Sequence, residues 1–115
     1  MEDNLIELLE TFGYPVFRQG SLAENEVYPP TFFTFWNNTE YEQSAYDNAT
    51  AFVIYDFDVN VYADDPNTVY SLQKQARILL KENGYQIPDR GHDLASDVDT
   101  HTGRGINVTK IEREV

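Results

Sequence analysis

The chain has 115 residues, a length that predicts one domain spanning residues 1–115, since folded domains commonly contain roughly 100–150 residues. It has no cysteine, which excludes disulfides, thiolate nucleophiles and cysteine-based zinc sites. Its formal net charge is -12, so most of its surface should repel a phosphate backbone, and a protein that grips duplex DNA is not expected.

The N-terminal residues and the hydropathy pattern bear on location. Residues 1–12 lack the basic start and apolar stretch of a signal peptide, and no run approaches the ~20 apolar residues of a membrane helix. We therefore expect a soluble protein made in the cytoplasm, without a membrane partner.

The acidic residues are unevenly distributed. Residues 1–73 contain 13 acidic residues and one basic residue, Arg18, whereas residues 74–115 contain 7 of each. An acidic wall past which DNA slides, a surface that mimics DNA, and a surface that only confers solubility all fit this charge. Charge alone leaves the three interpretations open.

The first 30 residues predict one helix and one short strand. Apolar residues spaced by three and four indicate an amphipathic helix that Gly13 ends. They are Leu5, Leu8, Leu9 and Phe12. Tyr14-Pro15 then favours extended backbone, which predicts a strand at Val16-Phe17-Arg18. A loop is expected at residues 21–30.

Two long strands are expected in the middle of the chain. Aromatic and β-branched residues at positions 31–36 predict the first strand. Residues 37–50 are polar and are interpreted as a long hairpin. Strict alternation over residues 51–63 predicts the second strand, with one continuously apolar face and another that turns polar at Asp56.

The strongest predicted helix follows these strands. Asp65 is the expected N-cap, Pro66 the first helical residue and Gly84 the C-cap. The predicted buried stripe consists of Val69, Leu72, Ala76, Leu79 and Leu80.

The rest of the chain predicts two strands separated by a loop. Tyr85-Gln86-Ile87 indicates a strand that Pro88 interrupts, and residues 89–105 are expected to form a loop. Residues 106–109 predict the last strand, which Lys110 and Ile111 put out of phase. A bulge or the end of the strand is expected there.

This order of elements predicts an α+β fold, a single domain with a mainly antiparallel sheet and two helices packed on one face. The chain has 16 aromatic residues, of which 11 lie between Tyr28 and Tyr62. Either packing buries them, or part of this aromatic area is exposed and contacts a protein partner. The candidate partner contacts are Phe32, Trp36, Tyr41 and Tyr46.

No catalytic, metal-binding or cofactor-binding site is predicted. His92-Asp93 and Asp97-Val98-Asp99-Thr100-His101 place two imidazoles and three carboxylates in one loop, but their spacing matches no known ligand pattern. A polar turn is favoured, and whether this loop binds an ion stays open. Nucleophile elbows and phosphate-binding glycine loops do not occur, so an enzyme is not expected.

A basic stripe in the second half of the chain suggests a subunit interface. Lys74, Arg77 and Lys81 recur at helical spacing in a chain that is otherwise acidic. They could bind an acidic face of another copy, and Asp56 and Asp58, on one face of their strand, are candidates for that face. The alternative is that the stripe is a solvated helix face.

The sequence patterns, taken together, resemble one known family. They are the helix of residues 5–12 with Val16-Phe17-Arg18, the segment Tyr28-Pro29-Pro30 to Trp36, the passage from Tyr55-Asp56-Phe57-Asp58 to Asp65-Pro66, and Asp99-Thr100-His101-Thr102-Gly103. The chain resembles, over nearly its full length, the tail terminator or tail-completion proteins of long non-contractile-tailed bacteriophages and prophages.

The resemblance implies a structural virion protein that is assembled in the host cytoplasm and located in the tail or neck. Such a protein forms a homo-oligomeric ring, usually a hexamer, which ends the tail tube and provides the head-tail joining surface. Its partners would be copies of itself, the tail tube protein and the head connector or neck protein, and DNA would pass without specific binding. The alternatives are a head-completion or neck adaptor protein and, less favoured, an acidic DNA-mimic inhibitor, which has no need of a basic helix stripe.

Overall fold

The computed structural model describes residues 2–18, 29–44, 51–88, 90–94 and 101–114, with the backbone alone described at 41–44, 51 and 113–114. Two helices and five strands occur in this part of the chain. In order they are α1 (Glu2–Glu10), β1 (Val16–Arg18), β2 (Thr31–Ser44), β3 (Ala51–Ala63), α2 (Pro66–Glu82), β4 (His92–Leu94) and β5 (Thr102–Glu114).

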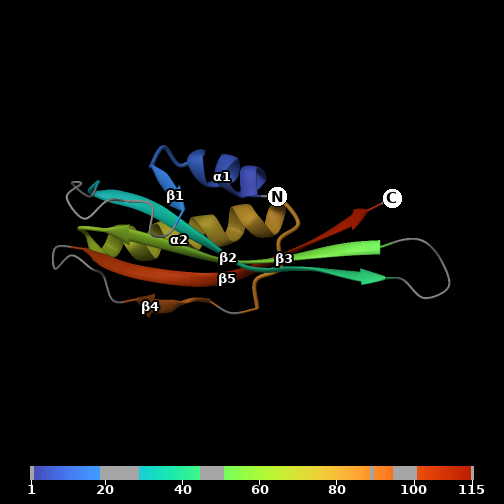
Figure 1. The fold of residues 1–115 in the computed structure, drawn as a ribbon. Coiled ribbons are helices and arrows are strands. Elements are labelled where there is room, and N and C mark those ends of the chain that lie inside the picture. Colours follow the sequence, from blue (N-terminus) through green and yellow to red (C-terminus); the bar gives the residue numbers. More distant parts are fainter. Residues whose placement is uncertain (1, 19–28, 45–50, 89, 95–100, 115) are drawn as a thin grey trace.

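The strands form one sheet in the order β1-β2-β3-β5-β4. β1 pairs with β2 in parallel, and every other pairing is antiparallel. The predicted α+β fold with a mainly antiparallel sheet is therefore confirmed. Figure 1 shows that β2, β3 and β5 continue past the helices as a three-stranded arm, and the chain measures 54 Å along its longest axis and 27 and 23 Å along the others.

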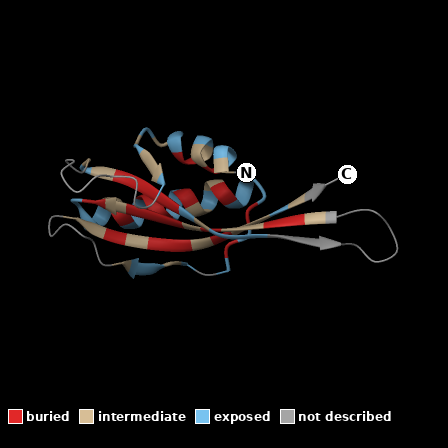
Figure 2. Ribbon diagram, viewed as in Figure 1, coloured by how far each residue is buried: buried red, intermediate tan, exposed pale blue. Residues whose placement is uncertain are grey.

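The core lies between the helices and one face of the sheet (Figure 2). Leu5 and Leu9 of α1 are fully buried, as the spacing of the N-terminal helix predicts. The alternating apolar residues of β3 contribute the floor of the core, because every second side chain of a strand points to the same face. They are Phe57, Val59, Val61 and Ala63.

Helix α2 begins as its sequence predicts, and its C-cap lies one residue before the predicted one. Asp65 is the N-cap, and its side chain accepts a hydrogen bond of 3.0 Å from the backbone nitrogen of Asn67. Asn83 occupies the C-cap position, and Gly84 follows it with a φ of 89°. The buried face differs in one detail: Leu79 is half-buried, while Gln73, a polar residue, is buried.

The predicted loop at residues 89–105 is wrong in two places, because β4 forms at His92–Leu94 and β5 already begins at Thr102. The glycines that suggested a loop lie inside β5, where neighbouring side chains pack closely on the backbone. A Cβ at Gly103 would lie 2.5 Å from the ring of Tyr62, and one at Gly105 would lie 2.5 Å from Oδ1 of Asn60.

Two other strand predictions also need correction. Residues 85–87 form no strand and make one isolated bridge, between Gln86 and Thr109, because Pro88 has no N–H with which to continue the pairing. The expected irregularity at Lys110 and Ile111 is absent, since β5 pairs with β3 in unbroken register up to Glu114. The bulge lies in β2 instead, between Asn37 and Thr39.

The predicted hairpin at residues 37–50 is formed by longer strands than expected. β2 runs through the polar segment to Ser44 and pairs there with Ala51 of β3, while residues 45–50 lie outside the described residues. Within the described chain, neither helix is long and apolar enough to cross a membrane.

Candidate functional site: the basic groove beside helix α2

A shallow groove of about 500 Å³ lies along α2, between the helix and the segment that follows it. We call this the basic groove, because Lys74, Arg77, Lys81 and Arg90 line it together with Ile78, Ile87 and Pro88. The side chain of Ile78 is 49% exposed, so apolar surface is accessible among the cations. The groove thus offers four positive charges and an apolar contact to a ligand.

None of the four groove cations forms a hydrogen bond or ion pair with another described residue. The other lysine and arginine side chains that the structure describes are all engaged. Arg18 pairs with Glu2 at 2.6 Å, Arg104 pairs with Asp93 at 2.8 Å, and Lys110 donates to the backbone oxygen of Asn83 at 2.6 Å. The chain has a net charge of -12, yet the described lysine and arginine side chains that lack a partner all line the basic groove.

Local sequence and long-range pairing each supply one wall of the basic groove. Lys74, Arg77 and Lys81 lie on one face of α2 because residues spaced by three and four are neighbours on a helix. The second wall, with Ile87 and Arg90, follows the bridge in which Gln86 and Thr109 exchange backbone hydrogen bonds of 2.7 and 2.9 Å. That bridge holds the post-helical segment against β5.

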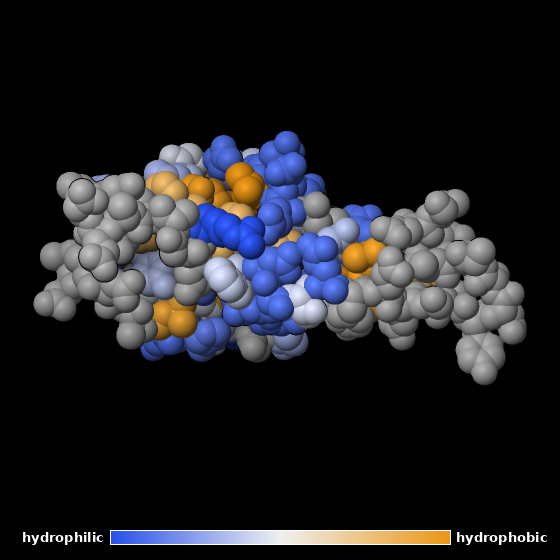
Figure 3. Space-filling view, in the orientation of Figure 1, coloured by the Kyte–Doolittle hydropathy of each residue, from blue (hydrophilic) through white to orange (hydrophobic). Residues whose placement is uncertain are grey.

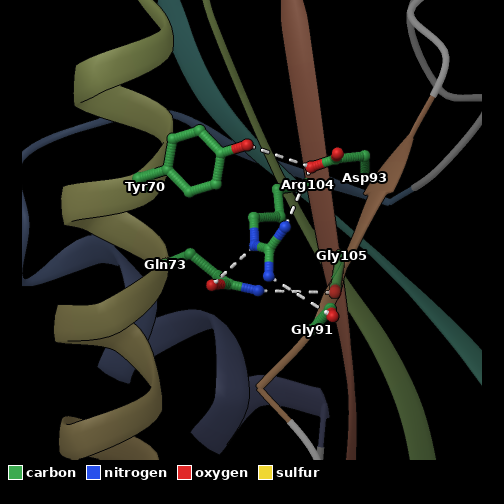
Figure 4. Close-up of polar contacts among 6 residues, drawn as sticks. All are labelled: Tyr70, Gln73, Gly91, Asp93, Arg104 and Gly105. Carbon is green, nitrogen blue, oxygen red and sulfur yellow. Dashed lines mark hydrogen bonds and ion pairs between the residues drawn. The ribbon is translucent and has the colours of Figure 1, made fainter.

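Arg104 of β5 fixes the chain just beyond this wall (Figure 4). It donates to Oε1 of Gln73 at 3.1 Å, to Oδ1 of Asp93 at 2.8 Å and to the backbone oxygen of Gly91 at 3.4 Å. Its guanidinium also lies 5.1 Å from the ring centre of Tyr70. Because Tyr70 and Gln73 belong to α2, these contacts tie the helix to β4 and β5, next to Arg90.

Glycine is required at position 91 for this arrangement. Its φ is 102°, a conformation that residues with side chains rarely adopt, and a Cβ there would collide with the side-chain nitrogen of Gln73. The close approach lets the buried Gln73 amide donate to the backbone oxygen of Gly105 at 3.5 Å. Gly91 therefore helps to keep the second wall of the groove close to α2.

Helix α1 carries exposed acidic residues. Figure 1 shows α1 along one side of the body and β4 along the other. Asp3, Glu7 and Glu10 of α1 are exposed and have no hydrogen-bond or ion-pair partner among the described residues. We call these three residues the acidic α1 stripe. A recess of about 390 Å³ adjoins it, lined by Glu2, Asp3, Arg18, Asn37 and Glu40.

Asp56 and Asp58 share one face of β3, as predicted, but both accept hydrogen bonds within the chain. Asn107 Nδ2 lies 2.5 Å from Oδ1 of Asp56 and 3.3 Å from Oδ1 of Asp58, and Asn38 donates to Asp56 at 3.3 Å. These hydrogen bonds from neutral amides occupy part of the carboxylate oxygens. Their role in a subunit interface stays a prediction, and the structure does not place them in the basic groove.

The four candidate partner contacts differ in what surface they present. Phe32 is 4% exposed and stacks on Tyr62 with ring centres 5.3 Å apart, so it has almost no surface for a partner. Trp36 is 46% exposed, with the guanidinium of Arg18 5.8 Å from its ring centre. Tyr41 lies in β2 with its side chain undescribed, and Tyr46 lies outside the described residues. Of the two described side chains, that of Trp36 presents surface on which a partner could dock.

The histidine-rich segment shows no metal site in its described part. Asp97 and Asp99 lie outside the described residues, and among those described no three histidine or carboxylate side chains are grouped to hold a metal ion. Nε2 of His101 lies 2.9 Å from the backbone oxygen of Pro29, and Asp93 pairs with Arg104. These contacts join loops and strands.

Tyr85 connects the end of α2 with the start of α1. Its hydroxyl donates to Oδ1 of Asn4 at 3.0 Å, and its ring is buried beneath Lys110. Burial, with a smaller contribution from the negative charge of Glu112, raises the pKa of Tyr85 to about 12. The neutral hydroxyl is therefore retained well above the usual range for tyrosine.

Sequence reasoning identifies three of the four groove cations. Lys74, Arg77 and Lys81 are visible in the helical periodicity, whereas Arg90 is brought to them by pairing between segments far apart in the chain. The sequence gives no signal for this approach, because it depends on the bridge between Gln86 and Thr109.

Hydrophilic residues cover much of the described surface in the view of Figure 3. Comparison of the sequence with models of known protein families gives no match, and comparison with curated proteins gives none either. The functional interpretation therefore depends on the residues of the chain itself and on the resemblance that they carry.

Proposed function

We propose that the protein is a structural subunit of a phage tail, which closes into a ring with copies of itself and ends the tail tube. The observation that carries the proposal is the presence of opposite charges on two separate surfaces. The cations of the basic groove beside α2 and three carboxylates of α1 have no partner among the described residues. Different patches that complement each other form a heterologous interface, which produces a ring when the rotation between copies closes.

The remaining negative charge suits a protein that surrounds DNA without holding it. A net charge of -12 keeps the averaged surface repulsive to phosphates. With the groove cations covered by neighbouring subunits, the wall of the ring would be acidic. The resemblance to tail terminators supplies the remaining partners: the tail tube protein on one side and the head connector or neck protein on the other, in the virion and without a catalytic step.

The experiment is to follow assembly of the wild type and of the Lys74→Glu/Arg77→Glu/Lys81→Glu variant, alone and with tail tubes. We expect the wild type to form rings that electron microscopy places at one end of the tubes, with a subunit number given by native mass spectrometry. The variant should stay monomeric in sedimentation velocity while its circular dichroism matches the wild type, because the three side chains are on the surface of α2.

Three results would contradict the proposal or redirect it. A wild type that stays monomeric with and without tail tubes would contradict it. Rings that bind purified heads and leave tail tubes bare would favour the neck adaptor instead. Turnover of a small molecule would replace the structural role with an enzymatic one.

A further inference from the structure

We propose that the acidic α1 stripe of a second copy occupies the basic groove, so that α1 of one subunit lies antiparallel to α2 of the next. This inference rests on the proposed ring and names the two surfaces that meet in it. The sequence suggested Asp56 and Asp58 for the acidic side. The described contacts favour α1, because the three carboxylates of the stripe have no partner among the described residues, whereas Asp56 and Asp58 accept amide hydrogen bonds.

The spacing of the charges on the two helices matches. Asp3, Glu7 and Glu10 are separated by four and then three residues, and Lys81, Arg77 and Lys74, read from the C-terminal end of α2, are also separated by four and then three. The first and last residues of each set are seven positions apart, which is about 10.5 Å at a rise of about 1.5 Å per residue. In the antiparallel orientation, Asp3 faces Lys81, Glu7 faces Arg77 and Glu10 faces Lys74.

The helix dipoles favour the same orientation. An antiparallel arrangement places the positive N-terminal end of α1 near the negative C-terminal end of α2. The exposed side chain of Ile78 adds apolar surface beside the cations of the groove.

The placement of the two surfaces allows a chain of copies to continue. The acidic α1 stripe and the basic groove belong to different elements and share no residue, and no ion pair joins them among the described residues of one chain. A subunit can therefore bind one neighbour through its groove and another through its α1 stripe, as a heterologous interface requires.

The test is a charge exchange between two variants. The groove variant is Lys74→Glu/Arg77→Glu, and the stripe variant is Glu7→Lys/Glu10→Lys, whose new lysines lie near the C-terminal end of α1, where the dipole tolerates positive charge. We expect each variant alone to assemble with a dissociation constant raised at least about tenfold. An equimolar mixture should assemble again, because the acidic groove of one variant now meets the basic stripe of the other.

Native mass spectrometry then distinguishes the pairing from a general charge effect. The mixture should contain equal numbers of the two variants in even-numbered rings, since like copies repel at both interfaces. The matched control is Asp64→Lys/Glu82→Lys, which makes the same change of charge at exposed positions outside the stripe and should assemble like the wild type. The neutral variant Glu7→Gln/Glu10→Gln should fall between the wild type and the stripe variant.

Several outcomes would overturn this pairing. Normal assembly of the stripe variant, or a mixture that stays dissociated while both variants are folded, would reject α1 as the occupant and leave the ring itself intact. Loss of assembly in Asp56→Asn/Asp58→Asn with normal assembly of the stripe variant would assign the acidic side to β3. Saturable binding of a short DNA duplex that depends on the four groove cations would show a phosphate site. Failure of the wild type to assemble would remove the proposed function as well.

Discussion

At the scale of single residues, two aromatic side chains of β2 differ in their exposure to solvent. Phe32 is 4% exposed and packs among other rings, including Phe17 at 6.0 Å between ring centres, whereas Trp36 is 46% exposed. We expect Phe32→Ala to lower the free energy of unfolding by roughly 3–5 kcal/mol through loss of burial and creation of a cavity. Trp36→Ala should cost about 1 kcal/mol, because its described ring contact is with a surface arginine.

Chemical denaturation of the two variants measures these losses, and sedimentation of the folded Trp36→Ala variant measures the role of the exposed ring. A higher dissociation constant for the oligomer of that variant would support Trp36 as a partner contact. Equal and small losses of stability in both variants would contradict the burial that separates them.

A second residue, Tyr85, predicts how stability depends on alkaline pH. Its pKa is raised from 10.0 to about 12 in the folded chain, first by burial and then by Glu112. Below pH 10 both the folded and the unfolded chain keep the phenolic proton, so ionisation of Tyr85 takes no stability away there. Between pH 10 and 12 the unfolded chain ionises while the folded chain does not, and roughly 2–3 kcal/mol of stability should be lost.

The measurement is urea unfolding of the wild type and Tyr85→Phe at pH 8 and pH 11. At pH 8 the variant should be about 1 kcal/mol less stable, because the hydrogen bond to Asn4 is gone. Between the two pH values the variant should lose less stability than the wild type. Parallel losses would mean that Tyr85 ionises as readily in the folded chain as in the unfolded one.

At the scale of elements, local signals predict what local interactions form. The bounds of α2 follow from its own residues, because Asp65 caps it, Pro66 fits its first turn and Gly84 ends it. The long strand β3 is equally predictable, since its alternation requires no knowledge of its neighbours. Elements of this kind carry their own start, face and stop signals.

Elements that depend on distant partners were predicted less well. Gly103 and Gly105 look like loop residues, yet they lie in β5 because Tyr62 and Asn60 approach the strand too closely for a side chain. The bulge in β2 likewise follows from pairing with β3 and has no signal in periodicity. The candidate site divides in the same way: its helical cations were predictable, and Arg90 required the bridge from Gln86 to Thr109.

At the scale of the whole molecule, the fold separates the surfaces that an assembling subunit needs. The sheet order puts β1 and β4 at opposite edges, with α1 contacting β1 and α2 contacting β3 and β5. The two helices therefore lie side by side with their charged faces outward. The exposed carboxylates of the acidic α1 stripe and the cations of the basic groove therefore lie on different elements.

This arrangement predicts that ionic strength controls assembly. Surface charges attract one another over a Debye length of about 10 Å at 0.1 M salt, which falls to about 3 Å at 1 M. We expect the dissociation constant of wild-type oligomers to rise steadily as sodium chloride is raised over this range. The Lys74→Glu/Arg77→Glu/Lys81→Glu variant, whose residual association no longer depends on this attraction, should respond weakly or in the opposite direction. Sedimentation velocity at a series of salt concentrations measures both.

Assembly of the wild type that strengthens with salt would indicate an interface dominated by apolar contacts. Ile78 and Trp36 would then be its first candidates, with the charged residues in a secondary role.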